Sequence, residues 1–131
     1  MLSSSEKVEK VARILIVEDT LQNQRLLKSM LNRLGYKADA VHNGQEALDL
    51  LAKQAYDLVL MDCKMPVLDG YEATRRLRQM ESEGAHTIVI GVTANAMDGD
   101  REQCLEAGMD DYLSKPFRLQ EITDLIQKWL G

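Results

Sequence analysis

Short apolar runs alternate along this chain with longer stretches of helical spacing, and this alternation constrains the fold more than any other feature. The clearest runs are residues 14–17, 58–61 and 88–92, which consist mainly of Val, Ile and Leu. Apolar runs of this length are typical of strands that helices cover on both faces. Repeated strand and helix units of this kind predict a parallel sheet.

Apolar residues three, four and seven positions apart recur between these runs and indicate helices. They predict helices over about residues 20–34, from residue 44, over 71–80, over 97–107 and up to the chain end. Residues 37–41 form a further short strand, and a last one lies around Tyr112 and Leu113. The residues expected to face the core are Leu27, Met30, Leu31, Leu34, Ala47, Leu48, Leu51, Ala73, Leu77, Met80, Met97, Cys104, Leu105, Ile122, Leu125, Ile126 and Trp129.

Few topologies suit these elements, because crossovers between parallel strands are right-handed. We therefore expect a single doubly wound α/β domain of the flavodoxin-like (βα)5 type. Its strand order, 2-1-3-4-5, is taken from the known folds of this type and places the ends of the first and third strands side by side. The length of 131 residues and the 45% hydrophobic content suit one such domain. We expect residues 12–131 to form it and residues 1–11, with three consecutive serines, to be a flexible tether.

Composition argues against several classes of function. The chain has 16 Lys and Arg against 21 Asp and Glu and no contiguous basic stretch, so direct nucleic-acid binding is not expected. The apolar runs fall short of the roughly 20 residues that span a bilayer, so we expect no membrane contact by this domain and a cytoplasmic location. Cys63 and Cys104 lack metal-ligand spacing and are interpreted as buried thiols.

Ionisable and hydroxyl side chains stand at the carboxyl ends of the predicted strands. Glu18 and Asp19 follow the first strand, Asp62 the third, Thr93 the fourth and Lys115 the fifth. Ligands bind outside these strand ends in such sheets, so the residues are expected to share one crevice. Carboxylates gathered there repel one another unless protons or a cation neutralise them. Mg²⁺, which takes oxygen ligands and often a phosphate, is the expected metal.

The same residues can carry phosphoryl chemistry. Asp62 ends a central strand alone, so it is the best candidate for a carboxylate nucleophile that forms an aspartyl phosphate. Glu18 and Asp19 would then serve the metal. Phosphoryl transfer needs mainly positioning and charge neutralisation, which Mg²⁺, Lys115 and the Thr93 hydroxyl can supply.

Each of these signals also has a plainer explanation. An acidic pair after a strand often only caps the next helix. Lys115 before Pro116 can be an exposed turn lysine, and Thr93 can be an ordinary strand-end residue. Their joint occurrence at the same position of successive strands favours the functional interpretation.

From residue 14 to residue 130 the chain resembles the receiver domains of two-component response regulators. That family has an acidic pair after its first strand, and an acceptor Asp followed by Met-Pro and Asp-Gly after its third. A Thr or Ser with a small neighbour follows the fourth strand, and Lys-Pro follows the fifth. The matching residues here are Glu18-Asp19, Asp62 within Met61-Asp62-Cys63-Lys64-Met65-Pro66-Val67-Leu68-Asp69-Gly70, Thr93-Ala94 and Lys115-Pro116.

The resemblance implies that Asp62 accepts a phosphoryl group from a phosphohistidine of a partner protein. It implies that Asp19, Asp62 and the backbone carbonyl of Lys64 hold Mg²⁺. Glu18 would bind the metal directly or through water. The Lys64 side chain could also pair with the phosphoryl group, or it could be a solvated turn lysine.

The resemblance also assigns roles to residues at the ends of the last two strands. It implies that Thr93 and Lys115 contact the phosphoryl oxygens. It further implies that Tyr112 is a switch aromatic, which rotates as Thr93 moves toward the phosphate, although Tyr112 could be a plain core tyrosine.

Three segments of the sequence look most like receivers fused to hybrid sensor histidine kinases. In such proteins the receiver domain is a phosphoaccepting signalling module and not a free-standing enzyme. Its partners would be a histidine kinase, a histidine phosphotransfer domain bound near the first helix, and on phosphorylation a second copy of the chain. Asn23, Leu26 and Leu27 lie near the face expected to bind the phosphotransfer domain, but they could equally be ordinary surface and core residues of that helix. The segments that carry this resemblance are Met61-Asp62-Cys63-Lys64-Met65-Pro66, Tyr71-Glu72-Ala73-Thr74-Arg75-Arg76 and Thr93-Ala94-Asn95-Ala96-Met97.

Other functions compete with this interpretation. An aspartyl-phosphate phosphatase would share the nucleophile and the metal, but it needs a second acid where Lys64 stands. A flavodoxin-like cofactor carrier needs a Gly-rich or hydroxyl-rich phosphate loop, and Glu18 and Asp19 would repel a flavin phosphate. A degenerate receiver acting as a scaffold, or the receiver of a DNA-binding response regulator, would share the fold.

Overall fold

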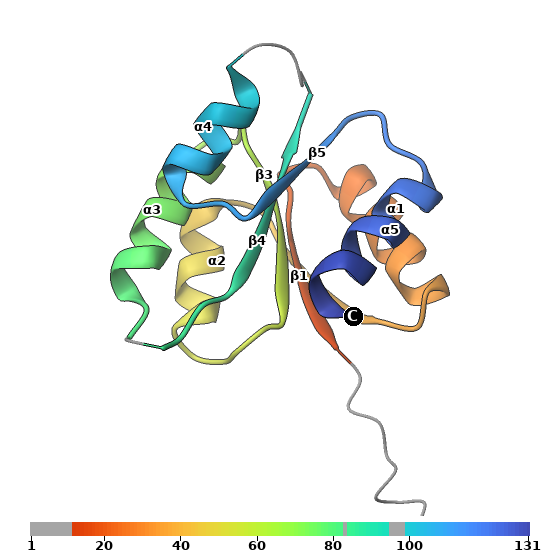
Figure 1. Ribbon diagram of the computed structural model, residues 1–131, viewed down its shortest axis with the longest axis horizontal. Coiled ribbons are helices and arrows are strands. Elements are labelled where there is room, and N and C mark those ends of the chain that lie inside the picture. Colours follow the sequence, from red (N-terminus) through yellow and green to blue (C-terminus); the bar gives the residue numbers. More distant parts are fainter. Residues whose placement is uncertain (1–11, 83, 95–98) are drawn as a thin grey trace, which may run out of the picture.

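The computed structural model describes residues 12–82, 84–94 and 99–131. The predicted tether, residues 1–11, lies outside these ranges. The described residues form a five-stranded parallel sheet with helices on both faces (Figure 1). None of their helices is both long enough and apolar enough to cross a membrane. In chain order the elements are β1 (Arg13–Val17), α1 (Leu21–Arg33), β2 (Lys37–Val41), α2 (Gly44–Leu51), β3 (Leu58–Asp62), α3 (Gly70–Met80), β4 (Ile88–Thr93), α4 (Asp100–Ala107), β5 (Asp111–Ser114) and α5 (Leu119–Leu130).

The strand order is β2-β1-β3-β4-β5, and every neighbouring pair is parallel. The predicted doubly wound α/β class and its strand order are therefore confirmed. α1 and α5 lie together on one side of the sheet, and α2, α3 and α4 lie on the other (Figure 1). Because the strands are parallel, their carboxyl ends all meet at one edge of the sheet.

Alternating side chains along each strand give the sheet two hydrophobic cores. Ile14 and Ile16 of β1 pack with residues of α1 and α5, whereas Leu15 and Val17 pack with residues of α2, α3 and α4. β3 is buried at every position, as a strand covered by helices on both faces should be. This central strand leads directly to Asp62.

Side-chain caps start three of the helices soon after the strands end. Thr20, Asn43 and Asp69 each accept a hydrogen bond from the backbone N–H three residues later, at 3.4, 2.9 and 2.9 Å. Such caps satisfy N–H groups that have no partner inside the helix. They fix where the chain turns from strand to helix, and so they hold the loops around the strand ends.

Two of the central strands extend one residue beyond their predicted apolar runs. Asp62 and Thr93 are therefore the last residues of β3 and β4, and not loop residues that follow them. Cys63, which follows Asp62, stays tied to β4 because its N–H donates to the Val92 carbonyl at 3.1 Å. The carbonyl of Thr93 itself accepts from the N–H of Lys115, which follows β5, at 2.7 Å. Sheet hydrogen bonds thus hold the backbone of both residues.

Two residues that we predicted to face the core lie at the surface. Met80 is 48% exposed because it ends α3 at the rim of an open cavity, and Leu105 is 46% exposed. The described part of α4 begins at Asp100, and residues 95–98, with the predicted core residue Met97, lie outside the described ranges. The buried residues of α4 are Cys104 and Ala107, so Leu105 points away from the sheet.

Candidate functional site

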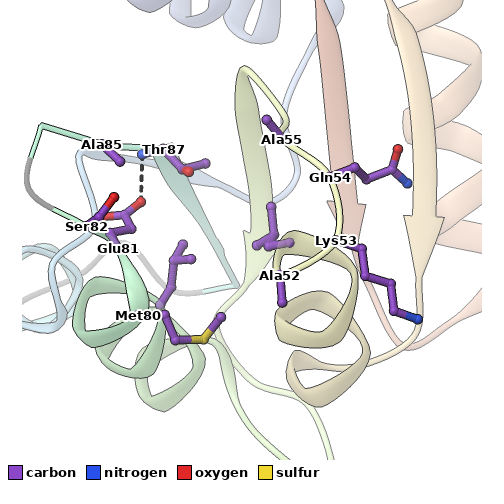
Figure 2. Close-up of a pocket in the computed structure, with 11 residues that line it drawn as sticks. Ala52, Lys53, Gln54, Ala55, Met80, Glu81, Ser82, Ala85 and Thr87 are labelled. Carbon is purple, nitrogen blue, oxygen red and sulfur yellow. Dashed lines mark hydrogen bonds between the residues drawn. The ribbon is translucent and has the colours of Figure 1, made fainter.

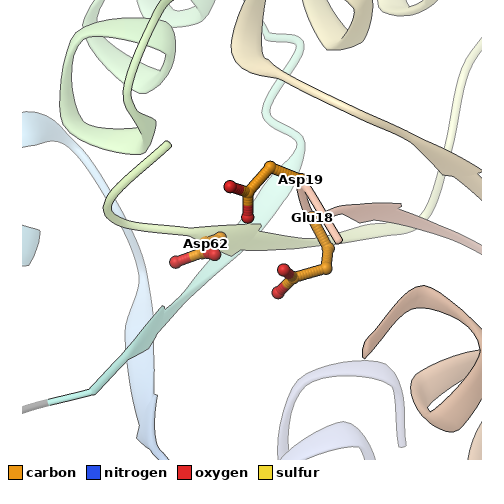
Figure 3. A group of neighbouring side chains, drawn as sticks. All are labelled: Glu18, Asp19 and Asp62. Carbon is orange, nitrogen blue, oxygen red and sulfur yellow. The ribbon is translucent and has the colours of Figure 1, made fainter. Parts of the chain in front are cut away.

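Three carboxylates meet where β1 and β3 end. The register of the two strands places Val17 beside Met61, so the residues that follow them emerge side by side. Glu18, Asp19 and Asp62 each offer an oxygen, and these oxygens all lie within 4.8 Å of one another (Figure 3). We call these three residues the acidic cluster. The convergence that the sequence predicts for these three carboxylates is present in the structure.

Glu18 is the most deeply buried member of the acidic cluster, with 2% of its surface exposed. Its Oε2 accepts hydrogen bonds from the Thr20 N–H, the Thr20 hydroxyl and the Asn23 amide, at 3.2, 3.2 and 3.3 Å. Its Oε1 lies 3.5 Å from the Lys115 ammonium. Burial acts to raise the pKa of Glu18, but the Thr20 hydrogen bond and Lys115 outweigh it and lower the pKa. Glu18 is thus held as a carboxylate.

Asp62 is 7% exposed and carries the most perturbed carboxyl group of the cluster. Burial is the largest influence and, with the nearby negative charge of Glu18, raises the pKa of Asp62 to about 6. The Lys115 ammonium, 3.6 Å from Oδ2, acts in the opposite direction, as does the Lys64 N–H, which donates to Oδ1 at 3.2 Å. The ionised form of Asp62 is therefore costly until a further positive charge arrives.

The crowding of negative charge extends to the third member of the cluster. The exposed Asp19 has a raised pKa, because of its partial burial and its interaction with Glu18. An all-oxygen donor set in which Glu18 is ionised, while Asp19 and Asp62 have raised pKa values, and which opens to solvent at Asp19, fits a hard divalent cation such as Mg²⁺. Lys64 lies at the same edge with an exposed side chain and a backbone tied to Asp62.

Thr93 ends β4 and is 3% exposed. Its hydroxyl donates a hydrogen bond to Oδ2 of Asp100, the first residue of α4, at 2.8 Å. The motifs in the sequence did not single out Asp100. An acidic residue in the first turn of a helix was the available signal, but it is so common a helix start that it did not single this residue out.

Tyr112 lies in β5, and its register partner on β4 is Gly91. It is half-buried and packs against the core under α2, α3 and α4. This position is compatible both with the predicted switch role and with a plain core role. The switch role stays a prediction.

A small cavity of about 200 Å³ lies beside the acidic cluster, and Lys115 and Glu18 form part of its wall. The rest of its wall comes from α1 and from the segment after β5, through Asn23, Leu26, Leu27, Pro116 and Phe117. A larger cavity of about 640 Å³ opens between the ends of α2 and α3, near the residues that lead into β3 and β4 (Figure 2). The larger cavity is thus at the opposite end of the strands from the acidic cluster.

The fold and the acidic cluster together define an α/β domain with a cluster of carboxylates suited to a divalent cation at its strand ends. The family model of the response regulator receiver domain matches residues 14–127. The chain belongs to this family, as its sequence motifs indicated. It is a signalling module of two-component systems.

Individual relatives agree with this assignment. The chain is 40% identical over 134 residues to hybrid signal transduction histidine kinase B of Dictyostelium discoideum, covering 94% of this chain. It spans only 7% to 10% of the length of the first three curated relatives, all hybrid histidine kinases of that organism.

Solved structures extend the comparison to the site. The receiver domain of a sensor histidine kinase from Pseudomonas aeruginosa PAO1, crystallised with a magnesium ion in its active-site cleft, is 47% identical with a TM-score of 0.85, covering 93% of this chain and 99% of that chain. The Saccharomyces cerevisiae receiver domain of Ssk1, in complex with the histidine phosphotransfer protein Ypd1, is 31% identical with a TM-score of 0.85, covering 93% and 90%. Magnesium is the metal that the acidic cluster suits.

Proposed function

We propose that Asp62 accepts a phosphoryl group from a phosphohistidine and that this modification is the signal the domain carries. One observation supports this most strongly. Asp62 lies with the other two carboxylates of the acidic cluster, and the Lys115 ammonium is 3.6 Å from Asp62 and 3.5 Å from Glu18. A carboxylate in such a place can attack phosphorus while a cation and an ammonium neutralise the phosphoryl oxygens.

Each remaining residue of the site has a proposed role. Asp19, Asp62 and the Lys64 carbonyl would hold Mg²⁺, with Glu18 binding it directly or through water. Bound Mg²⁺ would supply positive charge to the phosphoryl oxygens. Lys115 offers a second positive charge and Thr93 offers a hydroxyl donor.

Intact-mass spectrometry with acetyl phosphate and Mg²⁺ tests the acceptor. The wild-type domain should gain one phosphoryl group, and Asp62→Asn should gain none. Asp49→Asn, an exposed acid on α2, is the matched control and should gain the group as the wild type does. Labelling of Asp62→Asn, or no labelling of the wild type, would contradict the proposal.

The domain is proposed to act only on itself and not as a free-standing enzyme. The phosphatase alternative requires an acid two residues after the nucleophile, and Lys64 occupies that position with an exposed side chain. Incubation with p-nitrophenyl phosphate should release less than one equivalent of product for each domain. Sustained turnover over many equivalents would instead support a phosphatase.

The cavity of about 200 Å³ beside the acidic cluster is a proposed contact for the phosphodonor or for a histidine phosphotransfer domain. Leu26, which borders it, is 52% exposed, so a partner helix placed there would cover apolar surface while its histidine reaches Asp62. The complex of a similar receiver with Ypd1 supports a partner of this class.

A charged residue at position 26 tests this surface. Leu26→Glu should slow phosphotransfer from a phosphorylated histidine phosphotransfer protein about tenfold or more, because an interface anchor is lost. Its rate with acetyl phosphate should not change. Leu105→Glu, at a residue of similar exposure on α4, is the control and should leave the protein-to-protein rate intact. Equal losses in both variants would reject this surface.

We propose that the chain is part of a hybrid histidine kinase, that residues 1–11 are a tether within it, and that the domain works in the cytoplasm without binding nucleic acid. The relation to hybrid kinases supports this assignment. The coding sequence around this segment should contain a histidine kinase domain, and a DNA-binding domain there would contradict it. Light scattering before and after phosphorylation tests the predicted homodimer, which should form only in the phosphorylated state.

A further inference from the structure

The Thr93 hydroxyl has a competing partner in this structure. A hydroxyl group carries a single proton to donate, and Thr93 donates to Asp100 Oδ2 at 2.8 Å. A phosphoryl oxygen on Asp62 would need the same proton. Contact between Thr93 and a phosphoryl group therefore requires the bond to Asp100 to break, and the Asp100 carboxylate would lose this donor.

Asp100 lies on the face of α4 that turns toward the sheet. It stands four residues before Cys104, so the two side chains share one face of the helix. Cys104 is fully buried, with its sulfur 3.9 Å from that of Cys63. Asp100 thus lies one helical turn from Cys104, and Cys104 packs α4 against Cys63, the residue that follows Asp62.

A buried hydroxyl group without a hydrogen bond lies in the same region. Tyr71, near the start of α3, is 6% exposed, and its Oη has no hydrogen-bond partner among the described residues. The Cys63 thiol is near, but thiols are weak hydrogen-bonding groups. Burial raises the pKa of Tyr71 most, its interaction with the neighbouring Cys63 thiol comes next, and the Asp100 carboxylate raises it further, so Asp100 is within electrostatic reach. An unsatisfied buried hydroxyl is unusual in a native structure and calls for an explanation.

We propose that Asp100 is a positioning residue that exchanges hydrogen-bond donors when Asp62 is phosphorylated. In the resting state Thr93 donates to Asp100, and the Tyr71 hydroxyl has no hydrogen-bond partner among the described residues beyond the weak thiol of Cys63. In the phosphorylated state Thr93 donates to the phosphoryl group and Tyr71 donates to Asp100. This inference rests on the proposed function of Asp62 as the acceptor.

The exchange gives phosphorylation a direct effect on α4. Asp100 is the first residue of this helix. When its donor changes from Thr93 at the end of β4 to Tyr71 in α3, the start of α4 is held by α3 instead of by β4. α4 has only two buried residues, Cys104 and Ala107, so little apolar packing opposes such a shift. A helix with two alternative positions can convert the charge added by phosphorylation into a change in the surface that α4 presents to partners.

Weakening the hold of Asp100 on Thr93 tests the first half of the exchange. Asp100→Asn should speed phosphorylation by acetyl phosphate about fivefold, because a hydrogen bond to a neutral group holds Thr93 less strongly than one to a carboxylate. Glu102→Gln removes an equal charge from the same helical turn and should change the rate less than twofold. In a Thr93→Val background Asp100→Asn should have no effect, since it acts through the hydroxyl. Equal effects of the two charge removals, or an effect that persists without the hydroxyl, would overturn the proposal.

Removing the alternative donor tests the second half. Tyr71→Phe should leave the thermal stability of the resting protein equal or higher, because an unsatisfied buried hydroxyl is removed. The same variant should slow phosphorylation about threefold or more, since Asp100 then has no second donor. A loss of resting stability, or an unchanged phosphorylation rate, would refute this exchange. If the wild type itself is not phosphorylated, the proposed function fails; if it is phosphorylated and these variants behave like their controls, only the exchange fails.

Discussion

Replacing Asp62 by Asn should stabilise the folded domain at neutral pH while abolishing its proposed function. Burial is the main cause that raises the pKa of Asp62 from its ordinary value of 3.8 to about 6. Each pKa unit corresponds to about 1.4 kcal/mol, so ionising this carboxyl inside the folded protein costs about 3 kcal/mol at pH 7.5. Asn is neutral and nearly the same size, and its oxygen can still accept from the Lys64 N–H.

The effect should depend on pH in a defined direction. Because the folded-state pKa of Asp62 lies above the unfolded value, the folded state binds the proton more tightly. The stability that this proton contributes is fully present below about pH 4 and is lost as the pH rises through about 6. The two proteins should therefore be about equally stable near pH 4 and differ by about 2–3 kcal/mol at pH 7.5.

Urea denaturation followed by the fluorescence of Trp129, the single tryptophan, measures this difference. The series should run from pH 4 to pH 8 without divalent metal, with Asp49→Asn as a control for loss of a surface carboxylate. Adding Mg²⁺ should stabilise the wild type and narrow the gap, because the metal favours the ionised acidic cluster. An Asp62→Asn protein no more stable than the wild type at pH 7.5, or a gap of equal size at pH 4, would refute this reasoning.

Three further substitutions test separate parts of the structure. Lys115→Met should slow phosphorylation by acetyl phosphate about 100-fold, because a charge facing the phosphoryl group is lost; it should also raise the pKa of Asp62 further, as a carboxyl NMR titration would show. Val67→Gly should stabilise the fold to urea by about 1 kcal/mol, since Val67 has a φ of 72° that β-branched residues adopt only under strain. Gly91→Ala should cost about 2 kcal/mol in the same assay, because its Cβ would lie 2.5 Å from the Met109 sulfur and 3.1 Å from the Cys104 sulfur.

The sheet and the acidic cluster could be predicted because both follow from short-range pattern and topology. Uninterrupted apolar runs mark central strands, and parallel strands bring the residues after each run to one edge. Glu18, Asp19 and Asp62 therefore had to meet if the strand order was right. The pattern could not show that Glu18 would be almost fully buried, since that depends on Thr20 and the start of α1 folding over it.

The features that the sequence did not reveal depend on details at element ends. The hydrogen bond between Thr93 and Asp100 joins two residues seven positions apart, and no periodic pattern requires it. Met80 was expected inward because it shares a helix face with Leu77, but at the last residue of α3 this face borders an open cavity, and no described element covers Met80 there. Periodicity identifies the side of a helix that packs, but it does not show how far along the helix the packing extends.

Chemical trapping of the acyl phosphate tests the central claim most directly. Borohydride reduction of the domain after treatment with acetyl phosphate and Mg²⁺ would convert a phosphorylated aspartate to homoserine, and tandem mass spectrometry of its peptides would locate it. The account predicts homoserine at position 62 alone, and none when Mg²⁺ is omitted. Conversion at Asp19 or at another aspartate, or no conversion at all in a folded protein, would contradict it.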